Sequence, residues 1–143
     1  MSETHKALVR RYFELSNEGR VDDYVALLAP DFRLVGMGMP ASGVNHDMSA
    51  ADLAANARAY ESAFQRRICI ELDEVIGEGD AVVARGRSTA VTAAGIPYAN
   101  QYTFWFTFRD GLVTTIREFC CTYTVVHTLR QGGVAMTMAA TQA

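Results

Sequence analysis

The segment YANQYTFWFTFRDGLVTTIREFCC, from Tyr98 to Cys121, contains the clearest structural pattern in the chain. Apolar and polar residues alternate on both sides of Asp110-Gly111, as expected for a β-hairpin with one buried face. Tyr102 and Phe104 belong to the alternating set that we assign to this buried face, and Glu118 belongs to the matching set on the second strand. Burying a carboxylate against an apolar core costs free energy, so the position of Glu118 suggests either a function or a polar partner.

The turn sets which residues of this hairpin lie opposite each other. A two-residue turn would pair Thr103 with Glu118, whereas a three-residue loop with Gly111 in the left-handed conformation would pair Tyr102 with Glu118. We choose the three-residue loop, because it collects the apolar side chains on one face. A slip of one residue would reverse the two faces. Trp105 then stands on the outer face.

Length and charge limit the class of protein. The 143 residues suit a single domain, with a core from about residue 5 to 130 and a flexible tail from 131 to 143. The formal charge is −3 and the basic residues are scattered, which argues against a nucleic acid or an anionic membrane as partner and favours a small apolar organic molecule. No apolar signal core begins the chain and no run of about 18 apolar residues could span a membrane, so we expect a soluble, cytoplasmic protein.

Cysteines and histidines give no indication of a metal. Cys69, Cys120 and Cys121 are an odd number, and adjacent residues in a strand point to opposite faces, so we expect reduced thiols without a disulfide framework. No two of the three histidines stand at metal-ligand spacing with a carboxylate. We expect neither a metal nor another cofactor.

Helices precede strands in this chain. Apolar spacing predicts a helix from about His5 to Glu18 and a second from Asp22 to Leu28, followed by a short strand over 32–35. A capping box at Ser49–Asp52 opens a third helix that runs to about Gln65. From Ile68 onward the pattern is one of strands separated by turns. These patterns predict an α+β domain with a mostly antiparallel sheet.

Two segments resemble a known family. RRYFELSNEGRVDDYVALLAPDFRLV (10–35) looks like the opening helical hairpin of the nuclear-transport-factor-2-like (ketosteroid-isomerase-like) superfamily, and YANQYTFWFTFRDGLVTTIREF (98–119) looks like the closing hairpin of its SnoaL-like polyketide cyclase branch. The resemblance covers roughly residues 7–129. It implies a cone-shaped α+β barrel, in which three N-terminal helices close a pocket inside a curved sheet, often with dimerisation through the convex face. Functions within the superfamily range from cyclases, isomerases, dehydratases and epoxide hydrolases to binders without catalysis.

The resemblance makes Glu118 the first catalytic candidate. Glu118 stands where epoxide hydrolases and phenazine-biosynthesis proteins of this superfamily carry the acid of their closing strand. Desolvation among aromatic side chains should raise its pKa, which suits a general acid or base near neutral pH. The alternative is a structural Glu118 that is paired with an arginine or hydrogen-bonded to Tyr102.

Tyr12 matches the helix-1 tyrosine of the ketosteroid isomerases, which hydrogen-bonds an oxyanion. The match ends there, because the isomerase positions for the general base and for the second oxyanion donor are occupied here by Gly36 and Phe104. A true ketosteroid isomerase is therefore not expected. Tyr12 is either an oxyanion donor or a core tyrosine satisfied by a backbone partner.

Arg85 and Arg87 are similar to the arginine-x-aspartate pair of the epoxide hydrolases, but the second residue is not an acid. This difference argues against hydrolase chemistry of that kind. Alternation allows either Arg85 and Arg87, or Ala84 and Gly86, to face the pocket. We favour the second arrangement, which sends both arginines to the convex face.

The other candidates have weaker support. Asn100 could orient a substrate carbonyl or a water, or complete a buried hydrogen-bond network. His46, in the loop before the third helix, could act as acid or base at the pocket mouth, or be simply solvated. Tyr102 could assist Glu118. Apolar positions expected to contact the substrate are Phe104, Ile116, Cys120, Met37, Met39, Tyr60 and Phe64.

Two function classes follow from these residues. The first is a cofactor-free enzyme in which Glu118 moves a proton on an apolar ketone or polyketide-like substrate, giving cyclisation, isomerisation, dehydration or hydrolysis. The second is a ligand-binding or accessory protein with the same pocket and no turnover. In either case Trp105, Phe119 and Cys121 on the convex face predict a homodimer, because a monomer would leave too much aromatic surface in water.

Overall fold

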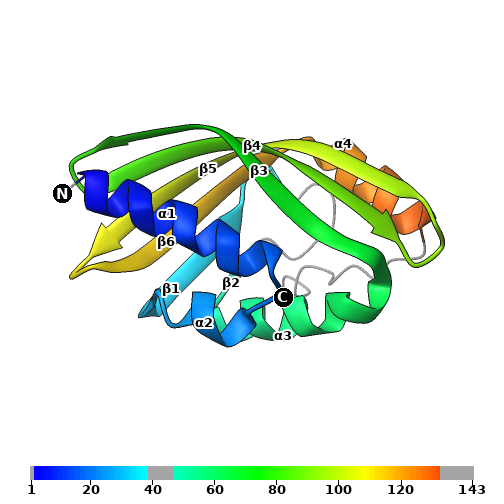
Figure 1. Cartoon of the computed structure of the whole chain (residues 1–143), viewed down its shortest axis with the longest axis horizontal. Coiled ribbons are helices and arrows are strands. Elements are labelled where there is room, and N and C mark those ends of the chain that lie inside the picture. The colour runs from blue at the N-terminus through cyan, green and yellow to red at the C-terminus, as the bar shows by residue number, and fades with distance from the viewer. Residues whose placement is uncertain (1, 39–46, 133–143) are drawn as a thin grey trace, which may run out of the picture.

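The computed structural model describes residues 2–38 and 47–132 of the chain, so most of the expected tail over 131–143 lies outside the described residues. Figure 1 shows the order of the elements and their arrangement. The elements are α1 (Ser2–Asn17), α2 (Val21–Val25), β1 (Leu28–Gly36), β2 (Asp47–Met48), α3 (Ala50–Tyr60), the 3-10 helix η2 (Glu61–Ala63), β3 (Phe64–Glu78), β4 (Ala81–Thr92), β5 (Pro97–Arg109), β6 (Leu112–Cys120), α4 (Thr122–Thr124) and the π-helical turn η3 (Val125–Leu129).

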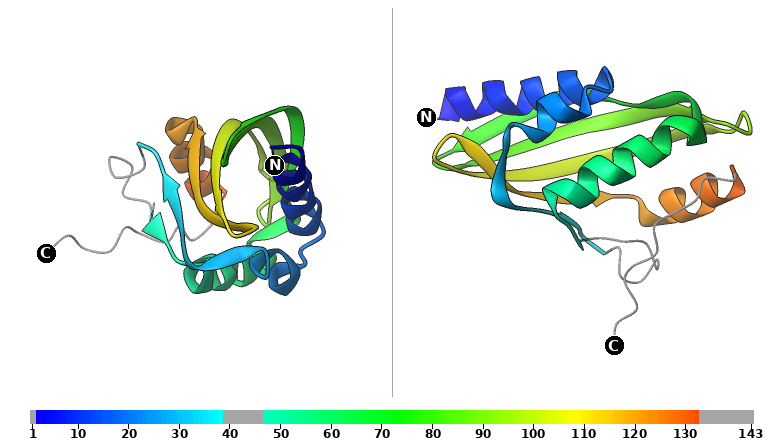
Figure 2. Two further views of the ribbon diagram at one scale, coloured as in Figure 1. Left: turned by 90° about the vertical axis from the view of Figure 1, so that its left-hand side faces the viewer. Right: turned by 90° about the horizontal axis from the view of Figure 1, so that it is seen from below.

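The six strands form one sheet in the order β2-β1-β6-β5-β4-β3. β1 pairs in parallel with β6, and the other pairs are antiparallel. The sheet curves without closing, and Figure 2 shows α1 along one side of its interior with α2 and α3 beneath. The α+β cone predicted from the sequence is confirmed, with an open sheet in place of a closed barrel.

Strand β5 provides the centre of the core, because alternate side chains along it are aromatic. Five of these face the helices and are buried, namely Tyr98, Tyr102, Phe104, Phe106 and Phe108. All of them except Tyr98 belong to the apolar cluster that includes the buried stripe of α1, where the ring of Phe13 lies 4.8 Å from that of Phe104. Burial of such large side chains supplies most of the driving force for this fold.

The hairpin of β5 and β6 has a different register from the one expected. Phe104, not Tyr102, lies opposite Glu118. The turn has two residues, Asp110-Gly111, both with positive φ (52° and 76°), which is the type I′ geometry that follows the twist of the strands. A bulge at Thr114 then shifts the pairing by one residue and returns Glu118 to the core face. The predicted faces are therefore correct for Ile116 and Glu118, beyond the bulge, although the predicted loop is wrong and Val113, assigned to the outer face, is buried in the core.

The third helix is shorter than expected. The capping box of Ser49 and Asp52 is present, but the helix ends at Tyr60, and after one 3-10 turn Phe64 begins β3. Phe64 still points inward, since it is buried against Tyr60 and the C-terminal segment. A residue that continues a helical stripe can equally start a strand, and only its packing partners distinguish the two.

The first strand is longer than expected, because β1 begins at Leu28 and passes through Pro30. Pro30 is tolerated there since the pairing of β1 with β6 is interrupted between Leu28 and Arg33, so no ladder hydrogen bond needs its missing N–H. The second helix is correspondingly short and ends at Val25.

Helical turns follow the last strand, and the sequence patterns did not indicate them. Within this segment Val125 and Leu129 are buried in a second apolar cluster with Phe64, Ala90 and Tyr98. This cluster covers the end of the sheet that the three N-terminal helices leave open, so the C-terminal segment completes the interior.

Strand β4 has the orientation that we favoured. Ala84 and Gly86 are buried, whereas Arg85 and Arg87 are exposed on the convex face. Arg87 forms ion pairs there with Glu71 on β3 at 2.9 Å and with Asp73. None of the helices in the described parts of the chain is long and apolar enough to cross a membrane.

Candidate functional site

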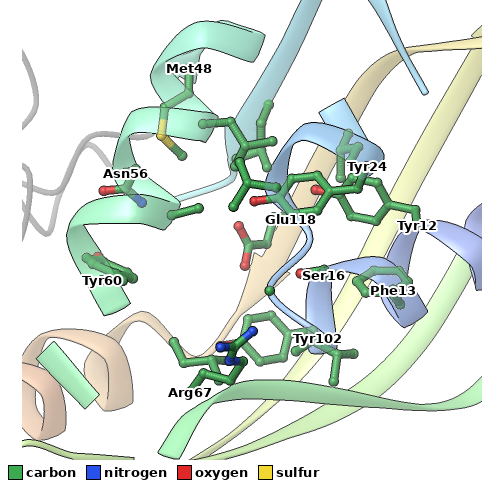
Figure 3. A pocket seen from close by; sticks show the side chains of 18 of the residues that line it. Tyr12, Phe13, Ser16, Tyr24, Met48, Asn56, Tyr60, Arg67, Tyr102 and Glu118 are labelled. Carbon is green, nitrogen blue, oxygen red and sulfur yellow. The ribbon is translucent and has the colours of Figure 1, made fainter. Parts of the chain in front are cut away.

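A cavity of about 280 Å³ lies between the concave face of the sheet and the surrounding helices. Figure 3 shows its interior. The wall is rich in aromatic side chains, which come from α1, α2, α3 and strands β3 and β5: Tyr12, Phe13, Tyr24, Tyr60, Phe64, Tyr98, Tyr102 and Phe104. Such an apolar space with few polar groups is typical of a small-molecule site.

Glu118 points into this cavity from β6 (Figure 3). Its strand lies between two others, so that Phe104 on β5 and Gly36 on β1 are its cross-strand neighbours. The N–H of Met37 donates a 2.8 Å hydrogen bond to the backbone oxygen of Glu118, which secures the main chain at this point. Gly36, which has no side chain, therefore flanks the carboxylate on one side.

The Glu118 carboxyl group is desolvated, and it is unpaired among the residues that the structure describes. Its side chain is half-buried because it borders the cavity, and protein surrounds it otherwise. This desolvation raises its pKa from the ordinary 4.5 to about 7. Over residues 2–38 and 47–132 no hydrogen bond or ion pair to the carboxylate is present, so the expected alternative of a pairing with an arginine or Tyr102 is not observed there.

Phenol groups surround this carboxylate. Burial is the main reason why the pKa values of Tyr12, Tyr60 and Tyr102 are raised, and the negative charge of Glu118 raises them further. Burial likewise raises the pKa of Tyr98 to about 12, with a smaller contribution from Glu118. All four phenols therefore remain protonated at neutral pH and can donate a hydrogen bond inside the cavity.

Tyr98 and Tyr102 form a hydrogen-bonded pair. Their hydroxyl oxygens are 2.6 Å apart, and the Asn100 side-chain amide donates to Tyr98 at 3.1 Å. Asn100 also exchanges hydrogen bonds with the backbone of Cys121 and does not line the cavity. Of the two expected roles, the buried network is the one seen, and Asn100 contacts the site only through Tyr98.

The remaining candidates are divided between the cavity wall and other places. Phe104, Ile116, Tyr60 and Phe64 line the cavity. Cys120 packs at the boundary of the two apolar clusters without lining it, and Met37 is 38% exposed on the surface. His46 and Met39 lie outside the described residues.

Sequence reasoning missed several lining residues. Asn56 on α3 lies between Leu53 and Tyr60 at helical spacing, a signal that could have identified it. Met48 from the short strand β2 has no comparable signal. Arg67 is the one lysine, arginine or histidine among the lining residues that the structure describes. It lies in β3, between the predicted end of the third helix at Gln65 and the start of the predicted strands at Ile68.

No group of three or more histidine, cysteine or acidic side chains suited to a metal ion occurs in the described ranges. The polar groups that the cavity itself provides include one carboxyl with a pKa of about 7, several phenol donors and one guanidinium.

Comparison with solved structures shows the same fold. An NTF2-like protein of unknown function from Burkholderia pseudomallei matches with a TM-score of 0.77 and 21% identity, over 90% of this chain and 98% of the other. A putative SnoaL-like polyketide cyclase from Jannaschia sp. CCS1 matches at 0.74 and 20%, over 90% and 93%. An LEH-like epoxide hydrolase from M. tuberculosis matches at 0.71 and 16%, over 92% of each chain.

Comparison of the sequence with known proteins gives a match to a family model. No curated protein sequence matches the chain significantly. The family model described as the SnoaL-like domain matches residues 9–116, which include the second half of α1, the strands β1 and β5 beside Glu118 and most of the cavity wall, and which end just before Glu118 itself. The chain therefore belongs to the SnoaL-like domain family.

Proposed function

We propose that the protein is an enzyme performing cofactor-free acid/base chemistry on an apolar ketone or polyketide-like substrate. The observation that carries this proposal is the unpaired Glu118 carboxyl, whose pKa of about 7 leaves both protonation states populated near neutral pH. Such a group can accept a proton and return it elsewhere on the same molecule. The reduced state of Cys69, Cys120 and Cys121 is compatible with action in the cytoplasm.

The surrounding phenols provide the second requirement of this chemistry. Removal of a proton from a carbon beside a carbonyl leaves negative charge on the carbonyl oxygen. Tyr12 or Tyr60, each a neutral donor near Glu118, could stabilise that oxygen by a hydrogen bond. Protonated Glu118 then delivers its proton to another carbon, which gives isomerisation, or assists ring closure or loss of water.

The similar proteins agree with this class of reaction, without identifying the substrate. One is described as a putative polyketide cyclase and another as an epoxide hydrolase. Because their identity to this chain is below a quarter, they support a shared fold, and the reaction must be argued from Glu118 and its neighbours.

A neutral two-ring probe tests whether Glu118 acts as a base. Nitrobenzisoxazole loses the C–H proton of its isoxazole ring to a base, its N–O bond breaks, and a coloured cyanonitrophenolate is released. We expect the wild-type protein to catalyse this reaction with a rate that rises as pH passes through about 7, because the carboxylate of Glu118 is the active form. Glu118→Gln should lower the rate by roughly 100-fold, as expected for loss of a general base.

Glu61→Gln provides the matched control. Glu61 is exposed at the rim of the same cavity, so this variant removes a carboxylate without emptying the interior. If Glu118→Gln turned over the probe as fast as Glu61→Gln, the catalytic role of Glu118 would be wrong.

The second candidate function is ligand binding without turnover. It is favoured by the two cross-strand neighbours of Glu118, Gly36 and Phe104, because neither supplies the second acidic group that the related isomerases use. In that case the wild-type protein would bind the neutral probe, detected by titration calorimetry, and would release no phenolate above the Glu118→Gln background.

A further inference from the structure

Arg67, an exposed residue, places a positive charge at the edge of a cavity whose wall is mainly apolar. It lies near the start of β3, and Figure 3 shows its side chain entering the site on the side of Tyr102. The carboxyl of Glu118 points into the same space from β6. Arg67 and Glu118 therefore border the same cavity from different strands, β3 and β6.

The turn after α1 makes room for this guanidinium. Gly19 has φ +72°, and a Cβ at that residue would come within 1.5 Å of the Nη1 atom of Arg67. The side chain of Arg67 therefore crosses from β3 onto the bare backbone of Gly19. Any larger residue would displace it from the cavity edge.

Arg67 has no acidic partner, unlike many arginines in this protein. Six others form ion pairs: Arg11, Arg20, Arg33, Arg58, Arg87 and Arg109. Within the described residues the Arg67 guanidinium makes neither an ion pair nor a hydrogen bond, although Glu61 also lines the cavity. The undescribed residues 1, 39–46 and 133–143 contain no aspartate or glutamate that could pair with it. No described residue occupies its donors, which a ligand in the cavity can therefore reach.

We propose that Arg67 binds a carboxylate of the substrate, so that the substrate is an apolar carboxylic acid whose reacting end lies at Glu118. A guanidinium presents two parallel N–H groups that match the two oxygens of a carboxylate. The aromatic wall between Arg67 and Glu118 suits an apolar ring system. The assignment rests on the proposed function for the role of Glu118, but binding of the acid by Arg67 does not require turnover.

A matched pair of probes separates charge from shape. Naphthoate and naphthamide have the same rings, but only naphthoate carries a carboxylate at neutral pH. Titration calorimetry with the full chain should show tighter binding of naphthoate. Arg67→Met should lower the affinity for naphthoate by about 10-fold or more, as expected for loss of charged hydrogen bonds, and should change the affinity for naphthamide much less. Arg67→Lys should restore part of the difference.

Arg66→Met is the control variant. Arg66 is the exposed neighbour of Arg67 on β3 and does not line the cavity, so its removal changes the net charge equally without touching the site. Arg66→Met should leave the preference for naphthoate over naphthamide unchanged. The proposal would be overturned if Arg66→Met and Arg67→Met lost the same affinity for naphthoate, or if the wild type bound the two probes equally well. It would also be overturned if neither probe bound to the wild type at millimolar concentration.

Glu118→Gln distinguishes this failure from that of the proposed function. If Arg67 binds the carboxylate, the preference for naphthoate persists in Glu118→Gln whether or not Glu118 is catalytic. Loss of the nitrobenzisoxazole reaction with a persisting preference supports both proposals. If Glu118→Gln keeps the preference for naphthoate and also turns over nitrobenzisoxazole at the wild-type rate, only the catalytic role of Glu118 is rejected.

Discussion

At the scale of single residues, Glu118 connects function to stability. Its pKa is about 7 in the folded protein and 4.5 in an ordinary glutamate, so the folded state holds its proton more tightly than the unfolded chain. The contribution to the free energy of unfolding is therefore complete below about pH 4.5 and is lost as the pH rises through about 7. At about 1.4 kcal/mol per pKa unit, the loss is on the order of 3 kcal/mol.

Glu118→Gln should remove this pH dependence, because an amide does not ionise. Urea unfolding of the wild type and the variant at several pH values measures the effect. The variant should be the more stable of the two above pH 7, and the two stability curves should converge toward pH 4.5. Parallel curves would show that desolvation of Glu118 is far weaker than the structure indicates.

At the scale of elements, the capping box of α3 holds one wall of the cavity. The Ser49 hydroxyl accepts a hydrogen bond from the N–H of Asp52 at 3.1 Å, and the Asp52 carboxylate accepts one from the N–H of Ser49. These bonds also lower the pKa of Asp52. They fix the start of the helix that carries Asn56 and Tyr60 into the site.

Ser49→Ala should lower the free energy of unfolding by about 1 kcal/mol, through loss of this cap. Ser62→Ala is the comparison, since Ser62 is exposed in the following 3-10 turn and has no such hydrogen bond. Thermal unfolding followed by circular dichroism measures both. Equal melting temperatures for the two variants would mean that the cap contributes little.

At the scale of the whole molecule, the convex face of the sheet exposes a group of apolar side chains to solvent, which is unfavourable for a monomer. Ile76, Val83 and Trp105 lie side by side across β3, β4 and β5, with Phe119 nearby on β6. Ile76 is 57% exposed, Trp105 43% and Phe119 42%. We propose that this face packs against a second copy of the chain, in a self-complementary contact of about 1,200–2,000 Å² if it has ordinary size.

Trp105→Arg should then weaken the dimer without emptying the cavity, because this side chain points away from it. Light scattering at micromolar concentration should report twice the chain mass for the wild type and a smaller mass for the variant. Gln101→Arg adds the same charge at an exposed site on the same face of β5 and should associate normally. A monomeric wild type would contradict the proposed dimer.

Local patterns were sufficient for much of this structure. Alternation in 98–121 predicted the buried side chains of β5 and, beyond the bulge, the inward position of Glu118, and the spacing of Ser49 and Asp52 predicted the start of α3. The alternation in 98–121 also placed Glu118 among aromatic residues. These features are set by interactions between residues a few positions apart in the chain, so the local sequence is enough to predict them.

Other features depend on contacts between distant segments. The bulge at Thr114 allows a two-residue turn while Glu118 stays on the core face, and the burial of both strands selects that arrangement over the three-residue loop. Packing against Phe64 and Tyr98 folds residues 122–132 back onto the sheet. Arg67 reaches the cavity because Gly19, 48 positions earlier, leaves space for it. Periodicity contains no information on such encounters, since they arise only when the burial of the whole core brings the segments together.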